Sequence, residues 1–263
     1  MTQLLKMNIF YAPDIDKIPF LPEEESQHAV KVLRMKSGEK IHIIDGMGGL
    51  YEAEIANLHP RYCEIQIIKK TPEYGKRNHH LHIAIAPTKN IERFEWFLEK
   101  ATEIGIDEIT PIICRFSERK ILKTERLQKI ILSAAKQSLK TYLPRLNDVC
   151  SFEEFITSQQ SVIAGLTHNP HRIGINCQEI AGQARNDNKY IAHCHDDEKT
   201  LLQNAYQRGD SALILIGPEG DFSKEEVELA IEKGFKPISL GNGRLRTETA
   251  GIAACHTINL LNN

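Results

Sequence analysis

The first third of the chain has the residue pattern of short strands. In residues 40–45, Ile41 and Ile43 alternate with His42, and this period of two is typical of a strand with one buried face. The glycine-rich segment 46–49 follows directly and predicts a hairpin turn. Strands are expected at 8–11, 40–45, 50–56 and 62–68, with one short helix at 24–35. This part of the sequence therefore predicts a small β domain.

The remainder of the chain alternates strand patterns with helix patterns. From Phe94 to Ala101, apolar residues recur at spacings of three and four, and Gly105 stands where a left-handed helix cap is expected. We expect helices at 91–104 and 124–141 and strands at 81–86, 108–114, 161–165, 190–194, 212–217 and 237–240. This alternation predicts an α/β fold, a parallel sheet with helices on both faces. The polar segment 71–80 predicts a linker between domains at 1–72 and 73–263.

Charge is distributed unevenly along a chain whose formal net charge is only −2. The segment from Arg115 to Arg145 holds nine basic and two acidic residues. A basic surface of this kind can hold a phosphate backbone, and so this segment predicts contacts with nucleic acid. A solvated helix face is the alternative interpretation.

Several classes of protein and site are not expected. The first twenty residues lack the apolar core of a signal peptide, and no apolar run is long enough to span a membrane, so we expect a cytoplasmic protein without membrane contact. The six cysteines form no Cys-x-x-Cys pair, which argues against a zinc site or a disulfide framework. The segment 193–197 holds ligand-type side chains, but neighbours in a strand point to opposite faces. No metal site is therefore expected.

Two loops at predicted strand ends carry the candidate chemistry. The loop 216–222 follows the most hydrophobic strand, and Ser223 and Glu226 then form a capping-box pattern that predicts a helix start. The loop 240–250 begins with glycines and becomes charged. Glycines let a ligand approach the backbone closely, yet neither classical nucleotide motif is present. The two loops predict one ligand between them, although each could be a plain turn.

Four segments of the sequence resemble one known family. They are IGPEGDF at 216–222, LGNGRLRTETA at 240–250, FLEKATEIGI at 97–106 and HAVKVLRMKSGE at 28–39. The paired GPEG and LRTETA strings are highly specific, and the resemblance extends over nearly the whole chain. The sequence is similar to the RsmE-type 16S rRNA uridine-N3 methyltransferases of the SPOUT superfamily.

The resemblance implies a fold and an activity. The C-terminal domain would be a SPOUT-type parallel sheet with a trefoil knot, and the N-terminal domain a PUA-like, RNA-binding β-barrel. The protein would be a homodimer that acts in rRNA processing and ribosome biogenesis. It would methylate N3 of one uridine in 16S rRNA of the small ribosomal subunit, in the decoding region near the 3′ end. A SPOUT methyltransferase of another RNA (tRNA or 23S rRNA) and a non-catalytic RNA-binding protein are the alternatives.

The resemblance also implies a cofactor site. S-adenosylmethionine would lie between the loop 217–220, the loop 240–245 and a strand end at 192–195. The expected cofactor-binding residues are Ala192, His193, Ile216, Gly217, Glu219, Gly220, Leu240, Gly241, Leu245 and Thr247. The chain departs from the family pattern at four positions: Asp221 replaces a glycine, Gly243 replaces an arginine, and Leu139 and Lys140 replace the glycine and the arginine of a Gln-Ser-Gly-Arg pattern.

The expected chemistry follows from the acceptor atom. Uridine N3 carries a proton and is a poor nucleophile until that proton leaves, and it lies on the base-pairing edge, so the target must be unpaired. We expect Arg246 to stabilise the developing anion or to bind a phosphate, and Glu248 to act as general base. For both residues an ion pair that pins the loop is the alternative. Arg34, Arg115 and Lys120 are the expected phosphate contacts.

Overall fold

The computed structural model of the protein describes residues 8–159 and 188–263. The chain divides into two compact units, and the division does not follow chain order. The first unit comprises Met1–Asn78, Leu98–Asp107 and Lys123–Arg145, and the second comprises His79–Phe97, Glu108–Leu122 and Leu146–Asn263.

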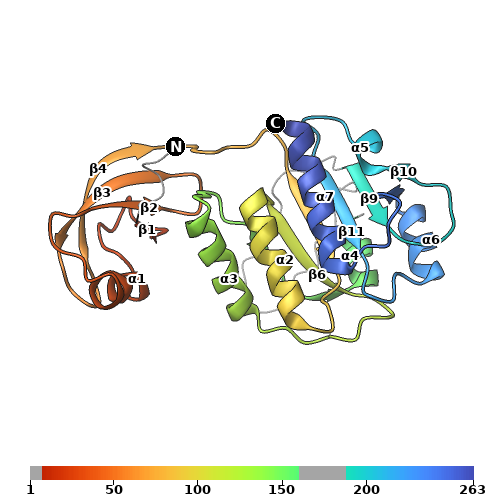
Figure 1. Cartoon of the computed structure of the whole chain (residues 1–263), viewed down its shortest axis with the longest axis horizontal. Helices are drawn as coiled ribbons and strands as arrows, with labels where there is room; N and C mark the ends of the chain where they lie inside the picture. The colour runs from red at the N-terminus through yellow and green to blue at the C-terminus, as the bar shows by residue number, and fades with distance from the viewer. Residues whose placement is uncertain (1–7, 160–187) are drawn as a thin grey trace, which may run out of the picture. The chain divides into compact units, whose positions relative to one another are not determined.

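The first unit contains a four-stranded sheet with the order β1-β2-β3-β4 (Figure 1). Its strands are β1 (Ile9–Tyr11), β2 (Lys40–Ile44), β3 (Leu50–Asn57) and β4 (Glu64–Thr71). β1 is parallel to β2, and the other neighbours are antiparallel. The Asp45 carboxylate accepts hydrogen bonds from the backbone N–H groups of Met47 and Gly49, which fixes the turn between β2 and β3. The strands and the hairpin predicted from the sequence are confirmed.

The helices of the first unit end differently from the prediction. The helix expected at 24–35 is a single turn, α1 (Glu23–Gln27), followed by a π-helical turn, η2 (His28–Val32). Arg34 has a φ of 52°, a left-handed conformation that cannot continue the helix. The helix expected at 124–141 is α3 (Thr124–Gln137), which ends four residues early, and Leu139 beyond it has a φ of 54°.

The second unit contains a larger sheet with the strand order β10-β12-β9-β11-β5-β6-β7, and β8 pairs with β6. The strands are β5 (Leu81–Ile85), β6 (Glu108–Ile113), β7 (Arg145–Leu146), β8 (Cys150–Ser151), β9 (Asn188–Ala192), β10 (Thr200–Leu201), β11 (Ala212–Ile216) and β12 (Lys236–Ser239). The pairs from β10 to β6 are all parallel, which confirms the predicted α/β class. The strand predicted at 161–165 and Cys177 lie outside the described residues.

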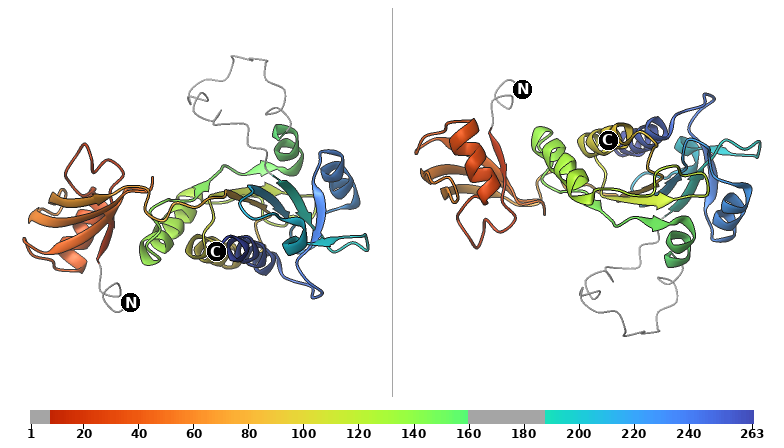
Figure 2. Two further views of the ribbon diagram at one scale, coloured as in Figure 1. Left: turned by 90° about the horizontal axis from the view of Figure 1, so that it is seen from above. Right: turned by 90° about the horizontal axis from the view of Figure 1, so that it is seen from below.

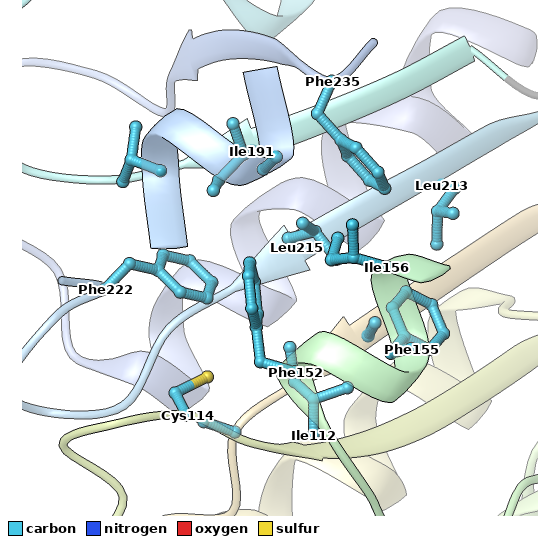
Figure 3. Close-up of a cluster of buried hydrophobic side chains, with 14 residues drawn as sticks. Ile112, Cys114, Phe152, Phe155, Ile156, Ile191, Leu213, Leu215, Phe222 and Phe235 are labelled. Carbon is cyan, nitrogen blue, oxygen red and sulfur yellow. The ribbon is translucent and has the colours of Figure 1, made fainter. Parts of the chain in front are cut away.

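Helices cover both faces of this sheet (Figure 2). The helices are α2 (Ile91–Ile104), α4 (Phe152–Ser158), α5 (Leu202–Ala205), α6 (Lys224–Glu232) and α7 (Thr247–Asn262). On one face, α4 and α6 pack their apolar side chains against Ile112, Leu213 and Leu215 of the sheet (Figure 3). On the other face lies α7, whose Gly251 approaches Phe97 of α2 and Ile85 of β5. The capping box predicted at Ser223 and Glu226 is present at the start of α6.

Candidate functional site

Three adjacent strands bring the predicted loops to one edge of the second unit's sheet. β12, β9 and β11 are consecutive and parallel, so their carboxyl ends lie at the same edge. The predicted cofactor residues Ala192 and Ile216 end β9 and β11 and are paired in register. The loops that follow are 193–199, 217–223 and 240–246. Ligands of open α/β sheets bind at such an edge.

The loop after β11 is tied to the loop after β9 through Asp221. This residue has a φ of 67°, a conformation that aspartate adopts more readily than most non-glycine residues. Its carboxylate accepts hydrogen bonds from the backbone N–H groups of Cys194 (2.7 Å) and Phe222 (2.9 Å). Asp221, which stands where the family has a glycine, therefore adopts a left-handed backbone conformation and connects the two loops.

The same loop is tied to α7 by a second hydrogen bond. The Thr247 hydroxyl donates to the Gly217 carbonyl at 3.0 Å, and both residues are buried. A Cβ on Gly217 would lie 3.0 Å from the Phe222 ring, and one on Gly220 would lie 3.0 Å from Phe116. These two glycines are thus needed for close packing of the loop itself.

His193 occupies an unusual position in the loop after β9. The residue is buried, and neither ring nitrogen has a hydrogen-bond partner in the part of the chain that the structure describes. Burial, with a smaller contribution from the Lys199 charge, lowers the pKa of His193. The imidazole is therefore held neutral, with one donor and one acceptor available to a ligand.

The loop after β12 is open to solvent. Gly241 and Leu245 are exposed and Leu240 is half-buried. Gly241 has a φ of 129°, which favours glycine, and a Cβ at Gly243 would meet nothing within 4 Å. The predicted cofactor residues of this loop are therefore accessible.

Lys140 of the first unit also departs from the family pattern. Its Nζ donates a hydrogen bond to the Ile104 carbonyl at 3.5 Å.

The two predicted catalytic residues lie at the start of α7 but differ in environment. Arg246 is the N-cap residue and is exposed. Glu248 is 7% exposed, and its Oε2 atom has no hydrogen-bond partner among the described residues. The Oε1 atom of Glu248 lies 3.9 Å from Nε of Arg93, a residue that the sequence reasoning missed. The buried carboxylate therefore faces a cation from α2.

A cavity of about 390 Å³ lies at the same edge of the sheet. Its lining residues come from the loops or helix starts after β5, β6 and β11, which are adjacent strands. They are Lys89, Asn90, Arg93, Glu118 and Glu219. Glu219, a predicted cofactor residue, accepts a hydrogen bond from the backbone N–H of Lys89 at 2.9 Å. Its side chain therefore lines this cavity.

The predicted phosphate contacts lie in different units. Arg34 is exposed in the first unit, whereas Arg115 and Lys120 are exposed in the second. The Arg115 guanidinium pairs with Glu225 at 3.1 Å, on the solvent side of α6. Such exposed pairs contribute little and can be replaced by a phosphate.

Part of the basic segment is neutralised within the first unit. Lys129 pairs with Glu24 at 3.1 Å, and Lys136 pairs with Glu25 at 2.7 Å. The Glu25 side chain is only 9% exposed, so the second pair is partly buried. These two lysines of α3 therefore act within the fold, and the basic segment presents a smaller positive surface than its composition indicates.

The described residues contain no group of three or more His, Cys, Asp or Glu side chains placed to hold a metal ion. The five cysteines within them are free thiols. Of the described helices, none has the length and apolar character needed to cross a membrane.

Comparison with known proteins identifies both parts of the chain. Residues 76–259 match the model of an RNA methyltransferase domain, and residues 21–68 match that of an RNA methyltransferase PUA domain. The Ribosomal RNA small subunit methyltransferase E of Buchnera aphidicola is 27% identical over 248 residues, which is 92% of this chain and 87% of the relative.

Solved structures are similar over almost the whole chain. A "probable rRNA-methyltransferase" from Porphyromonas gingivalis is 38% identical with a TM-score of 0.81, covering 97% of this chain and 98% of that one. A candidate methyltransferase from Legionella pneumophila, in complex with the cofactor SAM, is 26% identical with a TM-score of 0.77, covering 98% of both chains. The chain therefore belongs to the RsmE-type RNA methyltransferase family, with a PUA domain in its N-terminal part.

Proposed function

We propose that the protein transfers a methyl group from S-adenosylmethionine to N3 of one uridine in 16S rRNA, in the decoding region near the 3′ end. The observation that carries the proposal is the convergence of the loops after β9, β11 and β12 beside the buried Glu248. Relatives named for methylation of small-subunit rRNA support the choice of RNA.

The residues at this edge fit S-adenosylmethionine. The unpartnered ring nitrogens of His193, considered within the described residues, offer a donor and an acceptor to a ligand. The exposed backbone at Gly220 and Gly241 gives it room to approach. The expected binding residues are the ten at 192–193, 216–220, 240–245 and 247 named from the sequence. Bound there, the cofactor supplies an electrophilic methyl group.

The residues at the start of α7 prepare the acceptor. Glu248 takes the N3 proton, because its Oε2 atom has no partner among the described residues and burial leaves little competing water. Arg246, exposed at the N-cap, contacts the negative charge of the uridine or its phosphate. Arg34, Arg115 and Lys120 contact other phosphates of the RNA.

The proposal also includes two domains with separate roles and association into a dimer. Residues 1–72 form the RNA-binding domain and residues 73–263 the methyltransferase domain, whose final segment forms a trefoil knot. Two chains associate as a homodimer, and the protein acts in the cytoplasm, where ribosomal subunits are assembled.

Transfer assays with the full-length chain test the proposal. Labelled S-adenosylmethionine is supplied with small subunits, large subunits or tRNA from cells that lack the endogenous activity. We expect label in 16S rRNA alone, and a loss of about 100-fold or more in rate for Glu248→Gln with little change in cofactor affinity. Label in tRNA or 23S rRNA would contradict the choice of substrate, and cofactor binding without transfer to any RNA would contradict the activity.

A further inference from the structure

Of the side chains that line the cavity at Lys89, Arg93, Glu118 and Glu219, only Glu219 has a role in the chemistry described so far, as an expected cofactor residue. The position of the cavity at the strand ends favours a further role. The loops after β11, β5 and β6 line it, whereas the loops after β12, β9 and β11 form the expected cofactor site. The loop after β11 belongs to both, so the cavity adjoins the cofactor site. A methyl acceptor must lie beside the donor, aligned at near-attack distance.

Adjacent residues at the start of α7 contact the cofactor loop and the cavity lining. Thr247 donates to Gly217 of the cofactor loop, and Glu248 lies 3.9 Å from Arg93, which lines the cavity. The proposed general base therefore lies behind the cavity lining, next to Arg93. Its Oε2 atom is buried and has no hydrogen-bond partner among the described residues.

The cavity lining is polar and carries both charges. Lys89 pairs with Glu118 at 2.7 Å, and both side chains are more than half exposed, so this pair can open for a ligand at little cost. The Arg93 side chain is 40% exposed, and the contact of its Nε with Glu248 at 3.9 Å is too long for a hydrogen bond. Across the described residues this is the one ion pair that it makes, which leaves its N–H donors available to a ligand.

We propose that this cavity receives the uracil ring of the target uridine and that Arg93 donates hydrogen bonds to a uracil carbonyl oxygen. This inference rests on the proposed function and adds the acceptor site to it. A uracil ring presents two carbonyl oxygens beside its N3–H group, which matches a cation next to a carboxylate. During transfer the N3–H bond breaks and its proton passes to Glu248. The N3 electron pair forms the new bond to the methyl carbon as the C–S bond of the donor breaks, and Arg93 stabilises the charge on the carbonyl oxygen.

Two substitutions of Arg93 and one control test the inference in the full-length protein. Arg93→Gln removes the cation, and Arg93→Lys keeps the charge without the planar fork. Lys236→Ala is the control, because Lys236 is an exposed cation that begins β12, at the opposite edge of the sheet. Single-turnover transfer to small subunits, cofactor affinity and thermal unfolding are measured for each.

We expect Arg93→Gln to lower the transfer rate about 100-fold, within the range for loss of one charge-stabilising donor. Arg93→Lys is expected to lose about tenfold, and the control less than twofold. Cofactor affinity and unfolding temperature should stay near wild type. The deficit of Arg93→Gln should shrink as the pH rises above neutral, because alkaline solution ionises N3 without help, whereas a structural defect would persist.

Three results would overturn the inference. A transfer rate within threefold of wild type for Arg93→Gln removes the proposed role, and a parallel loss of cofactor affinity assigns Arg93 to the cofactor site. A deficit that is constant with pH indicates a structural role. If the wild-type protein transfers no methyl group to 16S rRNA, the proposed function itself fails and the acceptor site falls with it.

Discussion

Replacing Thr247 with valine should loosen the cofactor loop by a calculable amount. The substitution preserves the shape of the side chain but removes the hydroxyl that donates to the buried Gly217 carbonyl at 3.0 Å. A neutral hydrogen bond contributes about 0.5–1.5 kcal/mol, and a buried carbonyl left without a donor costs about 1–3 kcal/mol. The added methyl group offsets part of this. We therefore expect the free energy of unfolding to fall by about 1–2 kcal/mol.

The same change should weaken cofactor binding. The Gly217 loop loses its connection to α7 and must be ordered by the ligand instead. A penalty of about 1 kcal/mol corresponds to an affinity roughly fivefold lower, since 1.4 kcal/mol corresponds to tenfold. Urea unfolding measures the first effect, and calorimetric titration with S-adenosylmethionine measures the second.

Thr249→Val provides the matched control for this experiment. Thr249 lies two residues further along α7 and is exposed, so its substitution should change stability by less than about 0.5 kcal/mol. If Thr247→Val shows the same unfolding midpoint and cofactor affinity as the control, the hydrogen bond does not hold the loop and the reasoning is wrong.

Three further predictions concern the second unit. Gly251→Ala should destabilise the fold by about 1–3 kcal/mol in urea unfolding, because its Cβ would lie 2.6 Å from the buried Phe97 ring; an unchanged midpoint would contradict the close packing of α7. Ser223→Ala should cost about 1 kcal/mol through loss of the α6 cap, and Ser223→Thr should restore most of it; equal stability of both variants would refute the capping role. Burial lowers the pKa of His193 below its ordinary value of 6.5, so the unfolded imidazole binds a proton more readily than the folded one. The free energy of unfolding should therefore decrease as the pH falls from 7 towards the folded-state pKa, and less so in His193→Gln; identical slopes for the two proteins would exclude this linkage.

Local sequence signals predicted the regular elements well. The helix at 91–104 has the predicted bounds because its apolar spacing and Gly105 mark both its face and its end. The capping box at Ser223 fixed the start of α6 in the same way. Helix ends without such signals were misplaced. The residues after Gln137 continue a helical composition, but the chain turns at Leu139, whose left-handed φ is unusual for a leucine.

The site was only partly predictable, because its residues converge from separate loops. Glycine-rich strings at two strand ends marked the expected cofactor loops, and parallel strands necessarily carry such loops to one edge. Arg93 carries no comparable signal. It lies in an ordinary helical pattern, and its relation to Glu248 depends on how α2 and α7 cover the same face of the sheet. Asp221 departs from the sequence expected for the family, yet it adopts a left-handed backbone conformation that glycine favours.

Mapping the modified nucleotide tests the central claim most directly. Small subunits from cells that lack the activity are incubated with the purified protein and S-adenosylmethionine, and the 16S rRNA is digested and analysed by mass spectrometry. The account predicts one new 3-methyluridine near the 3′ end, with stoichiometry approaching one per subunit. A methyl group on another base, on another uridine atom or scattered over many sites would contradict it.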